Sequence, residues 1–92
     1  MTEPLETVRR RLAMRSMRRG IREMDLILQA FATAELPAMT EDDLALYEAL
    51  LEESDIEIFR WVSGQAVPPA RFAPLVQAIS GQSVGLTQPR GA

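Results

Sequence analysis

Apolar residues recur at intervals of three and four along most of this chain, which is the spacing of one face of an α-helix. The first stripe is Leu5, Val8 and Leu12, widened by Ala13 and Met17. No run of β-branched residues and no sustained alternation of apolar and polar residues competes with this pattern. The sequence therefore predicts an all-α fold.

Five helices are expected, and the chain is short enough that they form one small bundle around a single core. Thr40 followed by Asp43, and Ser54 followed by Glu57, resemble capping boxes that open two of them. The expected limits are about residues 4–18, 21–34, 41–53 and 55–63, with a fifth helix starting between 69 and 74. We expect the helical domain to span residues 1–80 and residues 81–92 to form a flexible tail.

Charge is distributed unevenly along the 92 residues, whose formal net charge is −3. Residues 1–34 carry seven arginines and four acidic residues, whereas residues 35–60 carry nine acidic residues and one arginine. Such a division fits two segments that attract each other, or a basic face and an acidic face that meet different partners.

The absence of histidine, cysteine and lysine excludes several kinds of chemistry. Cys/His zinc sites, thiol nucleophiles, Ser–His–Asp triads and lysine Schiff bases all need side chains that this chain does not contain. The usual attachment points for a covalent flavin, His and Cys, are missing as well. Carboxylate chemistry remains available, but the composition favours a binding protein over an enzyme.

Neither a membrane span nor a leader peptide is indicated. The longest uncharged run, residues 72–89, is interrupted by Gln, Ser, Gly and Pro, whereas a span needs roughly 18 consecutive apolar residues. Residues 1–20 are rich in arginine like an organelle leader, but Glu3 and Glu6 are atypical of one and the core needs this helix. We expect a bacterial cytoplasmic protein, or a processed form in the mitochondrial matrix.

The most distinctive local feature is Arg19-Gly20-x-x-Glu23, a glycine between two helical stripes. In a structural interpretation, Gly20 is the N-cap of the second helix, and Glu23 reaches back to a free backbone N–H and pairs with Arg19. In a functional interpretation, Gly20 leaves room for the backbone of another protein, with Arg19 and Glu23 as a charged pair at that contact. Both interpretations remain open at this point.

This motif and its surroundings resemble the succinate dehydrogenase assembly factor 2 family over roughly residues 9–79. The matching positions of the first half are Arg11-Leu12, Arg15-Ser16, Arg18-Arg19-Gly20-x-x-Glu23-x-Asp25, Leu28 and Phe31. Those of the second half are Leu44, Tyr47-Glu48, Leu50-Leu51, Asp55-Ile56, Trp61, Gly64 and Pro68. Ile21 departs from the family, in which Met or Leu is common at that position.

The resemblance implies a five-helix chaperone that binds the flavoprotein subunit of succinate dehydrogenase or fumarate reductase. Such a chaperone assists the autocatalytic, covalent attachment of FAD to that subunit, so the flavin is held by the partner and not by this chain. The family's signature maps onto Arg19, Gly20 and Glu23, and the resemblance implies that these residues bind the partner, with Arg15, Arg18 and Asp25 beside them.

Two other classes of function remain open. The arginines of residues 9–22 would suit a small helical nucleic-acid-binding regulator, although the overall charge and the acidic segment beside them oppose binding to phosphates. A generic helical adaptor is the second alternative. No Gly-rich dinucleotide loop follows a strand, so the sequence does not indicate direct FAD binding.

Overall fold

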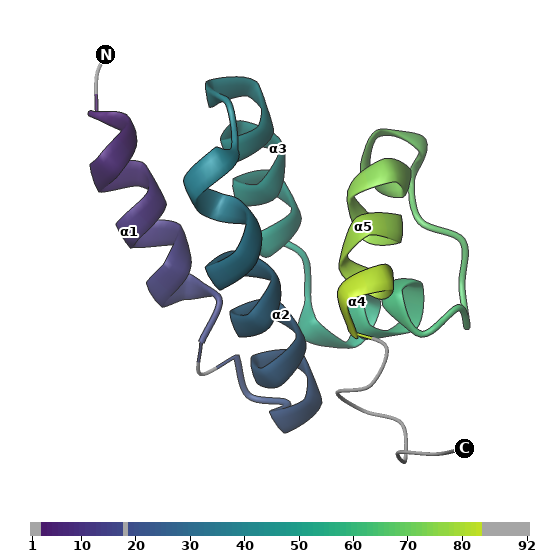
Figure 1. Ribbon diagram of the computed structural model, residues 1–92. Helices are drawn as coiled ribbons and strands as arrows, with labels where there is room; N and C mark the ends of the chain where they lie inside the picture. The colour runs from purple at the N-terminus through teal and green to yellow at the C-terminus, as the bar shows by residue number, and fades with distance from the viewer. Residues whose placement is uncertain (1–2, 18, 84–92) are drawn as a thin grey trace.

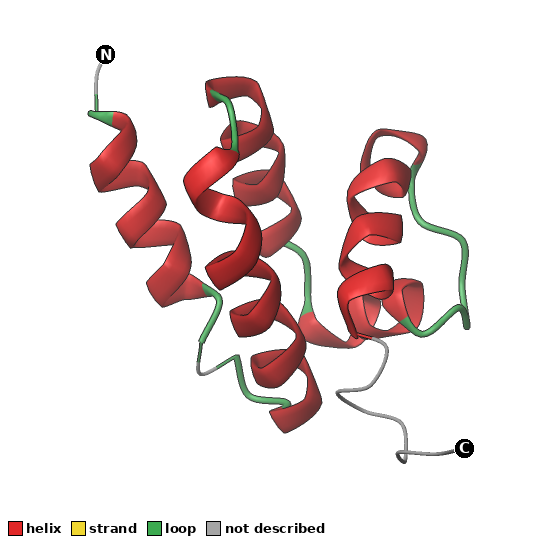
Figure 2. Cartoon of the chain, viewed as in Figure 1, coloured by secondary structure: helices red, strands yellow, loops and turns green. Residues whose placement is uncertain are grey.

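The computed structural model describes residues 3–17 and 19–83, and within them every regular element is a helix (Figures 1 and 2). The predicted all-α fold with five helices is confirmed. The elements are α1 (Leu5–Arg15), α2 (Arg22–Glu35), α3 (Glu41–Leu51), α4 (Asp55–Val62) and α5 (Ala73–Ser83), with 3₁₀ turns η1 (Leu36–Ala38) and η2 (Ala70–Phe72). None of the described helices is both long and apolar enough to cross a membrane.

The five helices form two groups that share one core. In Figure 1, α1 lies at one edge, α2 crosses the centre in the opposite direction with α3 behind it, and α4 and α5 lie at the other edge. Contacts join α1 to α2 and α3, and α5 to α2 and α4. The long α2 thus connects the N-terminal group of helices to the C-terminal group.

Among the described residues, eighteen apolar side chains form the buried core, to which all five helices contribute. Phe31 packs on Tyr47 with ring centroids 5.5 Å apart, and Trp61 packs on Phe72 at 6.0 Å. The core residues are Leu12, Met24, Ile27, Leu28, Phe31, Ala32, Leu36, Met39, Leu44, Tyr47, Leu50, Leu51, Ile58, Trp61, Val62, Phe72, Val76 and Ile79.

Local capping signals determine where the middle helices begin: the box predicted at Thr40 is complete, whereas at Ser54 only the N-cap half of the predicted box is formed. The Thr40 side chain accepts the Asp43 N–H at 3.2 Å, and the Asp43 carboxylate accepts the Thr40 N–H at 3.2 Å. Ser54 accepts the Glu57 N–H at 3.2 Å. Because these bonds satisfy N–H groups that the first helical turn leaves free, they place the starts of α3 and α4.

Several predicted limits differ from the structure, and the third helix, for example, ends at Leu51 and not near residue 53. The first helix ends at Arg15 and not near residue 18, with Ser16 as its C-cap, and Met17 beyond it is 37% exposed and does not extend the core stripe. The second helix has Ile21 as N-cap, not Gly20. The fifth helix continues to Ser83, past residue 80, where the expected tail begins. The rest of the predicted tail, residues 84–92, lies outside the described residues.

Candidate functional site

Three arginines at four-residue intervals pair with acidic residues of the C-terminal half of α3 and the start of α4. Arg11 contacts Glu48 at 2.5 Å, Arg15 contacts Glu52 at 2.9 Å, and Arg19 contacts Asp55 at 2.7 Å. The first two pairs stay level because α1 and α3 run in the same direction, so a step of four residues separates Arg11 from Arg15 and Glu48 from Glu52. The third pair lies beyond the end of α3, four residues further for Arg19 and three for Asp55. We call these three pairs the arginine ladder. The uneven charge of the sequence is thus used in part to hold two segments together.

The ladder becomes more buried toward the loop between α1 and α2. The first two pairs are about one-third or more exposed, whereas the side chains of Arg19 and Asp55 are only 12% and 18% exposed. Exposed pairs contribute roughly 0–1 kcal/mol each because water screens them. The Arg19–Asp55 pair is the best shielded of the three, and its arginine belongs to the motif Arg19-Gly20-x-x-Glu23.

Arg19 is held at both its side chain and its backbone. Its Nε donates to Asp55 Oδ1 at 2.7 Å, and its Nη1 and Nη2 donate to the carbonyl oxygens of Leu51 at 3.1 Å and Glu53 at 3.2 Å. Its backbone N–H donates to the carboxylate of Asp25 in the first turn of α2. The expected pairing of Arg19 with Glu23 is therefore wrong, because the guanidinium is already occupied at the corner between α3 and α4.

Gly20 has a backbone conformation that favours glycine. Its φ is +108°, a region in which a residue with a Cβ is strained. An added Cβ would lie 3.5 Å from Asp55 Oδ2, which is ordinary contact, so space within this chain does not require glycine. Within this chain, the backbone conformation of the turn is therefore the reason for glycine at this position. Gly20 is also exposed to solvent.

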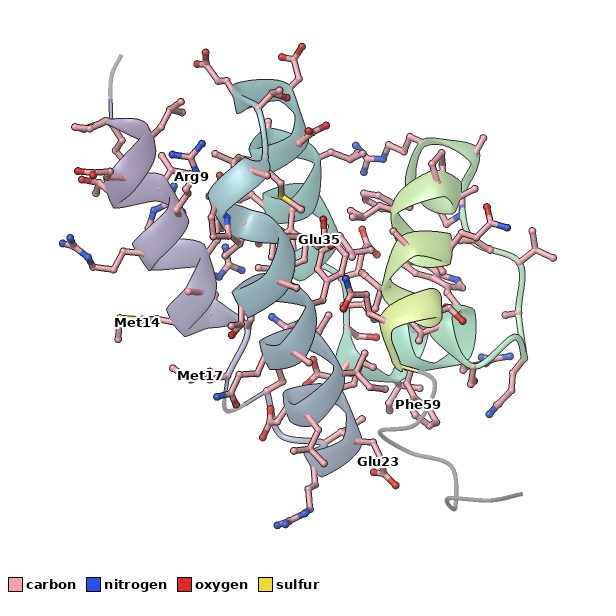
Figure 3. The ribbon with its side chains drawn as sticks, in the orientation of Figure 1. Arg9, Met14, Met17, Glu23, Glu35 and Phe59 are labelled. Atoms are coloured by element: carbon pink, nitrogen blue, oxygen red, sulfur yellow. The ribbon has the colours of Figure 1, made fainter. Side chains whose placement is uncertain are left out.

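Glu23 is exposed at the start of α2 and does not form the expected capping box. It is the second helical residue after the N-cap Ile21, which has no side-chain cap, so the register needed for the box is lost. Among the described residues the Glu23 side chain has no hydrogen bond and no ion pair, and Figure 3 shows it at the lower end of α2, pointing outward. Its carboxylate is therefore accessible to another molecule.

The other residues assigned by resemblance occupy different positions around this loop. Arg15 pairs with Glu52 and donates to the Leu51 carbonyl at 3.4 Å, and Asp25 accepts the Arg19 N–H. Arg18 lies outside the described residues. Arg15 and Arg19 line an open hollow of about 410 Å³ together with Met17, Glu53, Ser54 and Asp55.

Two features near the site were missed from the sequence. One is Asp55 as the partner of Arg19; the similar spacing of Arg11, Arg15, Arg19, four and four, and of Glu48, Glu52, Asp55, four and three, was a signal that could have found it. The other is the exposed apolar surface of Met14 and Met17, 65% and 37% exposed, which point outward on the same side of the molecule (Figure 3). Ile56, next to Asp55, is exposed as well, at 63%.

The ladder residues whose pKa values are shifted, Arg11 and Glu48, lie away from the loop between α1 and α2. The hydrogen bond from Arg11 lowers the pKa of Glu48, and the bonds to Glu48 and Glu3 raise the pKa of Arg11. Within the described residues, no three acidic side chains are grouped so that they could hold a metal ion. The site is therefore a charged and partly apolar surface around a constrained loop, an arrangement suited to contact with another macromolecule.

Comparison with known proteins gives a consistent answer. The family model Sdh5, described as flavinator of succinate dehydrogenase, matches residues 10–83. A protein of Cryptococcus neoformans named succinate dehydrogenase assembly factor 2, mitochondrial, is 39% identical over 79 residues, covering 84% of this chain and 45% of that protein.

Proteins with the same name occur in Saccharomyces cerevisiae and Dictyostelium discoideum. The first is 44% identical over 61 residues, covering 66% of this chain and 38% of the relative. The second is 38% identical over 68 residues, covering 74% of this chain and 48% of the relative. The chain thus spans less than half the length of these relatives. The family match runs from within α1 to the end of α5, and we conclude that this chain belongs to the Sdh5 family of succinate dehydrogenase flavinators.

Proposed function

We propose that this protein is an assembly factor that binds the flavoprotein subunit of succinate dehydrogenase, or of its relative fumarate reductase, and promotes covalent attachment of FAD to that subunit. The family match over residues 10–83 carries this proposal. The relatives' name, succinate dehydrogenase assembly factor 2, supports the same partner.

The docking surface in this proposal is the loop between α1 and α2 with the first turn of α2. Gly20 and Glu23 are exposed there and supply the direct contacts, with Arg15, Arg18, Arg19 and Asp25 at neighbouring positions. The exposed carboxylate of Glu23 has no partner among the described residues, so a cationic or hydrogen-bond-donating group on the flavoprotein is its complement.

The role proposed for this chain is conformational and not catalytic. Without His or Cys it has no usual attachment point for a flavin, so the residue that becomes linked to FAD belongs to the partner, where attachment is autocatalytic. The assembly factor binds preferentially to the flavoprotein state in which the flavin ring and the acceptor residue are aligned for reaction. A preference of about 1.4 kcal/mol for that state raises its ratio to the misaligned state tenfold.

Nucleic acid is not part of the proposed function. Arg11, Arg15 and Arg19 are engaged by the acidic residues of the ladder, which reduces the positive charge available to phosphates. We place the protein in the compartment in which the flavoprotein matures, the bacterial cytoplasm or the mitochondrial matrix; the relatives compared above are named mitochondrial.

The test is covalent flavin on the partner. Denatured extracts of cells with and without the gene are separated by electrophoresis and imaged for flavin fluorescence. We expect loss of one fluorescent band at the flavoprotein subunit without the gene, restored by the wild-type chain. In a purified system, the chain should accelerate covalent labelling of the apo-flavoprotein by FAD. Equal labelling rates with and without the chain would refute the proposal.

A further inference from the structure

The Arg19 side chain has little left to offer a partner protein. A guanidinium carries five N–H groups, and in Arg19 three of them, one on each nitrogen, donate hydrogen bonds inside the chain, to Asp55, Leu51 and Glu53. The side chain is only 12% exposed, so the N–H groups left on Nη1 and Nη2 are largely shielded from solvent. An arginine that recognises a partner's carboxylate by a bidentate contact needs two accessible donors, and burial limits both of these.

The bonds of Arg19 instead close the corner between α3 and α4. The carbonyls of Leu51 and Glu53 follow the last turn of α3, where helix geometry leaves carbonyl groups without partners. Asp55 is the first residue of α4. The guanidinium therefore satisfies acceptors on both sides of the break between these helices and attaches the loop between α1 and α2 to a rigid part of the fold.

The same residue also positions the next segment of the chain. Its backbone N–H is bound by Asp25 in the first turn of α2, so the segment between Arg19 and Asp25 is closed by a bond across six positions. Gly20, with φ +108°, makes the turn within this segment, and Glu23 lies on its helical part. The exposed members of the motif thus owe their placement to Arg19.

We propose that Arg19 and Asp55 form a positioning pair that holds Gly20 and Glu23 in the geometry that binds the flavoprotein, so that Arg19 acts through Asp55 and not through contact with the partner. This inference rests on the proposed function, and it adds Asp55 as a residue on which that function depends.

Binding to the purified flavoprotein subunit tests the proposal through a double-mutant cycle. The variants are Arg19→Gln, Asp55→Asn and the double substitution, each with its melting temperature measured. We expect each single change to weaken binding about tenfold and the double change to weaken it no further, because both remove one coupled interaction. If Arg19→Gln weakened binding while Asp55→Asn did not, Arg19 would contact the partner directly and the proposal would be overturned.

The variant Arg19→Lys distinguishes a positioning role of Arg19 from direct contact between its positive charge and the partner. Lysine keeps the positive charge but cannot reach one carboxylate and two carbonyls with a planar fork. We expect Arg19→Lys to bind nearly as weakly as Arg19→Gln. Recovery of wild-type affinity would mean that the charge itself meets the partner. The matched controls are Arg11→Gln and Glu48→Gln, at the first ladder pair, which should change affinity by less than twofold.

A second measurement uses this chain alone. Trypsin must bind the extended Arg19 side chain to cut the Arg19–Gly20 bond, so release of the pair exposes the bond to cleavage. We expect Asp55→Asn to raise cleavage after Arg19 several-fold, identified by fragment mass, and Glu48→Gln to leave it unchanged. Unchanged cleavage in Asp55→Asn would overturn the positioning role. This result does not depend on the flavoprotein, whereas failure of the wild-type chain to bind that subunit would count against the proposed function.

Discussion

The hydroxyl groups of Ser16 and Tyr47 lie 2.6 Å apart in the interior, where both side chains are fully buried. Ser16 is the C-cap of α1 and its hydroxyl also donates to the Leu12 carbonyl at 2.8 Å, so Tyr47 on α3 donates to Ser16. The aromatic pattern of the sequence predicts the polar end of Tyr47 at the rim of the core. The structure corrects this, because the C-cap of α1 supplies the buried partner that a tyrosine hydroxyl needs.

Substitutions of these two residues should have unequal effects on stability. Ser16→Ala leaves the buried Tyr47 hydroxyl without an acceptor and should cost about 1–3 kcal/mol. Tyr47→Phe should cost less, about 1 kcal/mol, because Ser16 keeps its bond to Leu12. Thermal unfolding followed by circular dichroism measures both, at roughly 4–8 °C per kcal/mol for a domain of this size. Equal losses would contradict the assigned direction of the bond.

Alkaline pH should destabilise the folded protein, and the side chain responsible should be Tyr47, through loss of its phenolic proton. Burial raises the pKa of Tyr47 from 10.0 to about 12, and the chain contains no other tyrosine, no lysine and no cysteine. Because the unfolded chain loses this proton first, stability is fully present below pH 10 and falls as the pH rises toward 12, on the order of 2 kcal/mol in all. Denaturant titrations across this range measure the fall, and Tyr47→Phe should abolish it. If the stability of Tyr47→Phe fell by the same amount over this pH range, ionisation of Tyr47 would not be the cause.

Acid pH should weaken the first pair of the ladder. The hydrogen bond from Arg11 lowers the pKa of Glu48 below its ordinary value of 4.5, so this pair stabilises the fold above that value and its contribution is lost as the pH falls through the lowered pKa. Both side chains are about one-third exposed, so the effect should be small and should shrink at high salt. Glu48→Gln should flatten the decline of the melting temperature below pH 4.5. An identical decline in wild type and variant would show that the pair does not contribute.

Gly20→Arg should abolish binding to the flavoprotein while the helices remain formed. The positive φ of Gly20 adds a strain of about 1–3 kcal/mol for any residue with a Cβ, and the new cation would cover the docking loop. Gly64→Arg is the matched control, because Gly64 also has a positive φ of +83° with nothing near its Cβ position. Both variants should melt at similarly lowered temperatures, and only Gly20→Arg should fail to co-purify with the subunit. Loss of binding in both would attribute the defect to instability.

Glu23→Ala should reduce covalent flavin on the partner at least tenfold while lowering the melting temperature by only a few degrees. The carboxylate contributes a few tenths of a kcal/mol to α2 through the helix dipole, but it is the exposed charge of the docking surface. Glu6→Ala is the control, since Glu6 is exposed at the equivalent second position of α1. Flavin fluorescence of the partner and thermal melts of the chain give the two readouts. A large drop in melting temperature with normal flavinylation would restore a purely structural role for Glu23.

The sequence by itself determined the helical class of this protein and much of where its helices begin. The caps at Thr40 and Ser54 act within three residues, so their geometry depends on the local chain and could be predicted from it. The motif Arg19-Gly20-x-x-Glu23 was also visible as a candidate site, because its residue types stand out against the helical stripes around it.

Only the tertiary structure decided what the members of that motif do. Local spacing paired Arg19 with Glu23 four residues away, but the fold presents Asp55, 36 positions along the chain, together with the carbonyls of Leu51 and Glu53 at and just after the end of α3. Three acceptors at a shielded corner outweigh one exposed helical pair. Arg19 consequently turns inward, Gly20 makes the turn, and Glu23 is left exposed, because the packing of α1 beside α3 determines which acidic residues each arginine can reach.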